Sequence, residues 1–146
     1  MELSTFGAIM KFAMDRERDI ADIALSAGTN EALSPFRELT ERIMSDSKKT
    51  AQLLERTRRE GINEVILHPV AGLESDNYRF QDRSTAQLAA REFGEYLTDT
   101  FERIAGFYTD AALKVSNPGA ARAFKQLAIQ RLKLRDEIKE HASRLK

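Results

Sequence analysis

Apolar side chains recur along most of the chain at steps of three and four residues, the spacing that places them on one face of an α-helix. The first pattern covers about 3–27 and is followed by Gly28, which we expect to cap the helix because glycine tolerates a positive φ. The second pattern starts at Ser34-Pro35, where serine suits the N-cap and proline the first helical position, and Gly61 is expected to stop it. These two patterns predict a pair of helices joined by a short link.

Two more helical patterns follow in the second half of the chain. One runs from about Ser84 to Val115, and the other from the break at 116–119 to the end of the sequence. Between the second and third patterns, residues 61–82 contain a short apolar run that ends at Pro69 and then a group of turn residues. We expect this segment to be a long connection with room for one short helical turn, and the sequence leaves its path open.

Two short links and one long link predict a single all-α domain over 1–146, a four-helix bundle made of two antiparallel hairpins. Helices of about 25 residues would be ~38 Å long. A bundle whose helices alternate in direction throughout needs a short middle loop. The sequence therefore favours a long crossover between the second and third helices, which is the connectivity of ferritin-like bundles.

Charge and composition narrow the classes of function. The sequence has 23 Lys+Arg and 23 Asp+Glu, and this zero net charge argues against a nucleic-acid binder. No apolar run approaches the ~20 residues of a membrane span, and the absence of cysteine excludes disulfides and thiolate metal sites. Glu2 stands where a signal peptide would be basic. We therefore expect a cytoplasmic protein with neither nucleic acid nor membrane as a partner.

Each predicted helix carries one short motif that it shares with a known family. The motifs are Ala13-Met14-Asp15-Arg16-Glu17-Arg18-Asp19-Ile20, Phe36-x-x-Leu39, Phe107-Tyr108 and Phe124-x-x-Leu127-Ala128. Together they resemble the rubrerythrin branch of the ferritin-like superfamily over nearly the whole chain. The resemblance implies two irons between the helices, held by one Glu from each of two helices and a Glu-x-x-His from each of the other two.

The chain departs from that ligand pattern. Its histidines, His68 and His141, come three residues after Val65 and Ile138, so no Glu-x-x-His is present. Mapped residue by residue, the resemblance keeps only the glutamate of the first helix. The expected ligand positions fall on Glu17, on Ser47 and Thr50, on Phe101, and on Arg131 and Leu134. The resemblance thus implies a degenerate di-iron site with no metal or other cofactor, and iron is the alternative if this register is wrong.

Glu17 and Arg131 each interrupt an otherwise apolar stripe, one in the first predicted helix and one in the fourth. A buried charge is tolerated when it is paired. We predict that these two side chains form an ion pair where the metal centre of the family would lie, with Ser47 and Thr50 as hydroxyl partners. The alternative is that either long side chain lies at the edge of its stripe and reaches solvent.

Other groups of titratable residues give weaker signals. Two sets have a spacing that could bind a metal: Glu137, Glu140 and His141 near the end of the sequence, and His68, Glu74 and Asp76 in the crossover. Such placements are ordinary in solvated, charge-rich segments, so we assign no metal site to them. No cysteine, nucleophilic serine motif or glycine-rich loop indicates a catalytic residue.

Aromatic side chains crowd the third predicted helix, on more than one face: Phe93, Tyr96, Phe101, Phe107 and Tyr108. A helix that is apolar over a wide arc buries more than one surface. We expect a homo-oligomer, a dimer through the third helix, with a lid formed by the apolar run at 65–67 as another use of that surface.

The expected function follows from the missing ligands. We predict a rubrerythrin-like binding or assembly module without an intact di-iron site and without catalytic residues. The alternative class is an enzyme, a divergent non-haem iron oxidoreductase of the rubrerythrin type that acts in peroxide or oxygen stress. The side chains in the middle of the bundle and the metal content of the protein distinguish the two, because a fold alone does not settle activity.

Overall fold

The computed structural model describes residues 1–65, 70–81 and 83–145. Most of them belong to four long helices: α1 (Phe6–Ala27), α2 (Arg37–Val65), α3 (Ala90–Lys114) and α4 (Pro118–Ser143). Three short 3-10 helices lie in the connections: η1 (Glu31–Phe36), η2 (Ser75–Tyr78) and η3 (Thr85–Gln87). The predicted all-α, four-helix architecture is confirmed. No helix in these described ranges has an apolar stretch long enough to cross a lipid bilayer.

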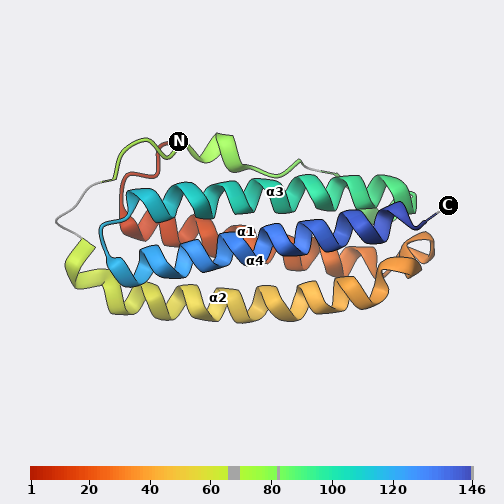
Figure 1. The fold of residues 1–146 in the computed structure, drawn as a ribbon, viewed down its shortest axis with the longest axis horizontal. Coiled ribbons are helices and arrows are strands. Elements are labelled where there is room, and N and C mark those ends of the chain that lie inside the picture. Colours follow the sequence, from red (N-terminus) through yellow and green to blue (C-terminus); the bar gives the residue numbers. More distant parts are fainter. Residues whose placement is uncertain (66–69, 82, 146) are drawn as a thin grey trace.

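The helices pair as two hairpins. α1 packs antiparallel to α2, and α3 packs antiparallel to α4 (Figure 1). Residues 70–81 and 83–89 run along the length of the bundle, so that α3 begins at the end where α2 begins (Figure 1). As a result α2 and α3 run in the same direction, and the two hairpins lie side by side.

Short polar side chains begin two of the helices. Thr5 Oγ1 accepts a hydrogen bond from Ala8 N at 3.1 Å before α1, and Asn117 Oδ1 accepts one from Ala120 N at 3.0 Å before α4. These oxygens satisfy backbone N–H groups that have no partner inside the helix. Pro118 occupies the first position of α4, where a missing N–H removes no helical bond.

The link between α1 and α2 differs from the expectation. Ser34-Pro35 lies inside η1, which is capped by Asn30, so the expected cap at Ser34 is wrong and α2 begins later, at Arg37. Gly28 does end α1, but with a right-handed φ of −63°. Its N–H still bonds to Ala24 O at 3.3 Å, as in an ordinary helical turn, so no positive φ is required there.

Two further helix boundaries are corrected. α2 continues through Gly61 to Val65, so glycine does not stop it; a single glycine in a helix costs only about 1 kcal/mol. The third helix does not start at Ser84. Ser84 Oγ instead accepts a hydrogen bond from Ala86 N at 3.4 Å and caps η3, and α3 begins at Ala90.

The N-terminal segment pairs with the first described part of the long connection. Leu3 N donates a hydrogen bond to Leu73 O at 2.7 Å, and Glu2 and Glu74 form an isolated antiparallel bridge. The side chains of Leu3 and Leu73 are both buried. Backbone pairing and apolar burial therefore hold this end of the connection on the bundle.

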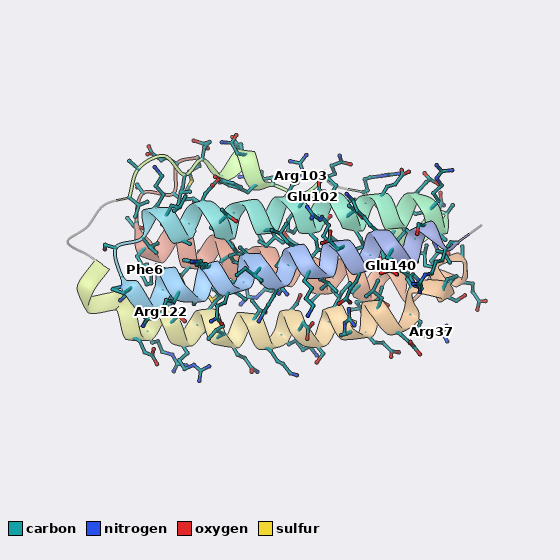
Figure 2. All side chains as sticks on the ribbon, viewed as in Figure 1. Phe6, Arg37, Glu102, Arg103, Arg122 and Glu140 are labelled. Carbon is teal, nitrogen blue, oxygen red and sulfur yellow. The ribbon has the colours of Figure 1, made fainter. Side chains whose placement is uncertain are left out.

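Side-chain hydrogen bonds fasten the rest of the connection. Three of them join it to α3: Tyr78 Oη donates to Asp110 Oδ2 (2.6 Å), Tyr96 Oη to Gln81 O (2.8 Å), and Arg103 Nη1, labelled in Figure 2, to Arg79 O (3.3 Å). At the far end, Asn30 Nδ2 donates to Thr85 O and to Leu88 O, each at 3.0 Å. Residues 84–89 therefore contact the α1–α2 link and do not form part of α3.

The second apolar face of α3 is covered within the same chain. The ring centroid of Phe107 lies 4.9 Å from that of Phe12 and 5.3 Å from that of Tyr78, and Tyr96 is only 5% exposed. Residues of α1 and of the long connection therefore cover this aromatic face together. The dimer through α3 gains no support from this face and stays a prediction, and the predicted lid at 65–67 lies mostly outside the described residues.

α3 and α4 come into close contact at Gly94. A Cβ atom added there would lie 2.7 Å from the Cβ of Ala142. We predict that Gly94→Ala lowers the free energy of unfolding by about 1–3 kcal/mol, because the two helices must move apart. The matched control on the same helix is Gly106→Ala, which meets nothing within 4 Å and should raise that free energy by ~0.5–1 kcal/mol. Urea denaturation measures both, and equal stability of the two variants would contradict the contact.

Tyr78 gives the long connection a pH-dependent contact. Burial and the hydrogen bond to Asp110 raise the pKa of Tyr78 to about 12 from its ordinary value of 10.0. Because the pKa is higher in the folded state, this contribution to stability is complete below pH 10.0 and is lost as the pH rises through about 12. We predict that the free energy of unfolding falls more steeply over this range in the wild type than in Tyr78→Phe. Urea titrations at a series of pH values measure this, and parallel curves would rule it out.

Candidate functional site

The middle of the bundle holds two buried charges. Glu17 on α1 is 0% exposed and Arg131 on α4 is 2% exposed, and they come from different hairpins. The residues one turn before and after them on the same helix faces are apolar and buried, as the helical stripes predict: Ala13 and Ile20 on α1, and Leu127 and Leu134 on α4. Burial at this level excludes the alternative in which either side chain reaches solvent from the edge of its stripe.

The two side chains meet in a three-contact ion pair. Arg131 Nη2 donates to Glu17 Oε1 at 2.5 Å and to Oε2 at 2.9 Å, and Arg131 Nε donates to Oε1 at 3.1 Å. Contacts of this kind between a guanidinium and both carboxylate oxygens are short and strongly directional. The pair therefore forms in the geometry that compensates best for the loss of water around both charges.

Of the two hydroxyl partners expected from α2, the structure shows one. Thr50 Oγ1 accepts a hydrogen bond from Arg131 Nη2 at 2.9 Å, as predicted. Ser47 is buried as well, at 2% exposed, but within the described chain it makes no hydrogen bond to Glu17 or Arg131. The predicted role of Ser47 is therefore wrong.

Two aromatic side chains of α3 complete the site. The ring of Phe101 lies beneath the guanidinium of Arg131, with 5.9 Å between the Cζ atom and the ring centroid, which is a cation–π contact. Tyr108 is fully buried, and no atom of the described chain forms a hydrogen bond of good geometry with its hydroxyl. The sequence pattern identified Tyr108 only as an apolar position, because tyrosine on an aromatic stripe is ordinarily part of the core.

Burial and neighbouring charges shift the pKa values of the three titratable groups in the site. Burial raises the pKa of the Glu17 carboxyl, and the charge and hydrogen bonds of Arg131 and the nearby Tyr108 hydroxyl offset only part of that rise. Burial raises the pKa of Tyr108 well above its usual range, and the charge of Glu17 adds to the effect. For Arg131, burial acts to lower the pKa, but the Glu17 carboxylate outweighs it and the pKa is raised. The guanidinium therefore stays charged.

The donor set of this site does not suit iron. Of the positions to which the resemblance assigns ligands, only Glu17 carries a carboxylate, and its oxygens already accept three hydrogen bonds from Arg131. Phe101 and Leu134 offer no donor atom, and both are buried. A guanidinium at the centre repels a metal cation, which needs several carboxylate or imidazole ligands.

The other candidate metal-binding groups are engaged elsewhere. His141 Nε2 lies 2.6 Å from Pro35 O, Glu137 pairs with Arg42, and Glu140 pairs with Arg144. His68 lies outside the described residues. Within the residues that are described, no group of three or more His, Cys, Asp or Glu side chains is arranged to hold a metal ion.

Comparisons of this chain with protein-family models, with curated proteins and with solved structures find no match. The chemistry of the site is therefore argued from its own contacts. These contacts give an ion pair that joins the two hairpins, held from one side by Thr50 and from the other by the ring of Phe101. Nothing in this arrangement exposes a nucleophile or a base to a substrate.

Removal of one partner of the pair leaves an unpaired buried charge. We predict that Glu17→Ala lowers the free energy of unfolding by ~3–5 kcal/mol, and that Glu17→Leu combined with Arg131→Met recovers most of the loss, because apolar packing replaces the pair. The control is Glu95→Ala, which breaks the exposed pair with Arg91 and should cost less than about 1 kcal/mol. Urea denaturation of the four proteins measures these differences. A Glu17→Ala variant no less stable than Glu95→Ala would contradict the burial of the pair.

Proposed function

We propose that this protein is a ferritin-like bundle of the rubrerythrin type whose di-iron centre has been replaced by a structural ion pair, and that it serves as a binding or assembly module rather than as an iron enzyme. The observation that carries the proposal is that Arg131 donates hydrogen bonds to both carboxylate oxygens of Glu17. Under this proposal, a cation of the protein itself replaces the metal cations of the family, at a position that the resemblance assigns to a ligand.

The connectivity supports the ferritin-like part of the proposal. Two antiparallel hairpins, with α2 and α3 parallel and a long connection lying along α3, match a bundle with a single crossover (Figure 1). The side chains that fasten the connection, such as Tyr78 and Asn30, are specific to this path.

The burial of the centre supports the non-catalytic part. Glu17 is 0% exposed, and the hydroxyl of Tyr108 is enclosed with it, so a substrate has no access to either group. A general acid or base must come within hydrogen-bond distance of its substrate. With the centre buried, the outer faces of the helices are the surfaces that can bind a ligand or another chain.

Metal content tests the proposal. We predict that the protein produced in iron-supplemented medium contains iron well below a stoichiometric amount after desalting, as measured by inductively coupled plasma mass spectrometry. The variant Glu17→Gln serves as the control, and its iron content should be the same, because this carboxylate is bound to Arg131 and not to a metal. Near-stoichiometric iron that is lost in Glu17→Gln would overturn the proposal and favour the non-haem iron oxidoreductase.

A further inference from the structure

A groove of about 440 Å³ lies between α2 and α4 and opens above the buried ion pair. We call it the α2–α4 groove. Its floor includes Thr50 and Arg131, and its apolar lining comes from Leu53 on α2 and from Leu127 and Leu134 on α4. The groove is thus the place where the surface of the molecule comes closest to the guanidinium described above.

The charges that line the α2–α4 groove do not cancel. Arg42 and Glu137 line it as well, but they form an ion pair with each other. Arg131 is likewise matched by Glu17 behind it. The charged residues of the lining that are left are two lysines and one acid: Lys49 on α2, Lys133 on α4, and Asp46 on α2. The groove therefore carries an excess of positive charge on a chain whose formal net charge is zero.

Arg131, which lines the groove, also has hydrogen-bonding capacity left. Its contacts with Glu17 and Thr50 are made through Nε and Nη2. Among the described residues, no hydrogen bond is seen from Nη1, which carries two further N–H donors. A guanidinium that is held by four hydrogen bonds loses little side-chain entropy when it binds a further acceptor.

We infer that the α2–α4 groove binds a small organic phosphate, with the phosphate between Lys49 and Lys133 above Nη1 of Arg131 and the organic group against the leucine lining. A phosphate monoester carries close to two negative charges near neutral pH, which suits two lysines on opposite walls. The apolar lining favours a monoester over inorganic phosphate. This inference rests on the proposed function, because it takes Arg131 to be held by Glu17 in a metal-free bundle.

The probe is butyl phosphate, titrated into ¹⁵N-labelled protein while the Nε–H resonance of Arg131 is followed. We expect saturable shifts of this resonance, weaker binding of inorganic phosphate, and no binding of butanol. Lys49→Gln and Lys133→Gln should each weaken binding of butyl phosphate by about tenfold, since each removes one charge-assisted contact. Asp46→Asn should tighten binding, because it removes the one uncompensated acid of the groove.

The matched control is Lys48→Gln, which removes an exposed lysine from the neighbouring position of α2. It should bind butyl phosphate as the wild type does. All four substitutions lie at partly or fully exposed positions away from the core. We therefore expect the variants to fold like the wild type, which circular dichroism checks. Absence of binding by the wild type, or equal losses in Lys48→Gln and Lys49→Gln, would overturn the inference.

Metal analysis of the same samples separates the two proposals. A metal-free protein that fails to bind butyl phosphate contradicts the groove inference alone. A protein with stoichiometric iron contradicts the proposed function, and the argument from a fixed Arg131 then fails with it. A metal-free protein with lysine-dependent binding supports both.

Discussion

The buried contact between Glu17 and Arg131 decides what the centre of this bundle can do. It joins α1 to α4, and so one hairpin to the other, in a region that is otherwise apolar and aromatic. Either charge alone would be strongly destabilising there, whereas the pair is tolerated because the carboxylate accepts hydrogen bonds from Nε and Nη2 of Arg131 and Thr50 adds a further acceptor. Such a centre is a joint between hairpins. Its one carboxylate accepts three hydrogen bonds from a side chain of the protein itself.

The long connection also helps to hold the two hairpins together, at the surface of the bundle. It lies along α3 and covers the aromatic face that α4 leaves open, with Tyr78 against Phe107 and its hydroxyl on Asp110. Both ends are fastened, one by the N-terminal segment and the other by Asn30 in the α1–α2 link. Since these anchors come from the first hairpin and the covered face belongs to the second, the connection helps to keep the two hairpins in register around the ion pair.

The α2–α4 groove connects this interior to the surface. On the α3 side the connection and the aromatic rings close the bundle, but α2 and α4 leave a groove whose lining includes the same Arg131. One residue, Arg131, thus forms the buried ion pair through Nε and Nη2 and also belongs to the lining of the groove. A binding function there needs no departure from a structural role at the centre, because the two roles use different nitrogen atoms.

The sequence by itself determined whatever depends on a local, repeating constraint: the helices with their apolar stripes, the break before α4 at 116–119, and the two charges that interrupt the stripes. It also indicated how those charges would be satisfied, because a buried carboxylate has few suitable partners in a chain with one interrupting cation. Only the tertiary structure decided the start of α3, the place of Tyr108 beside Glu17 and the existence of the groove. These depend on contacts between distant segments, such as the hydrogen bonds from Asn30 to residues 85 and 88, and on the spacing of α2 and α4, which no local pattern of residues records.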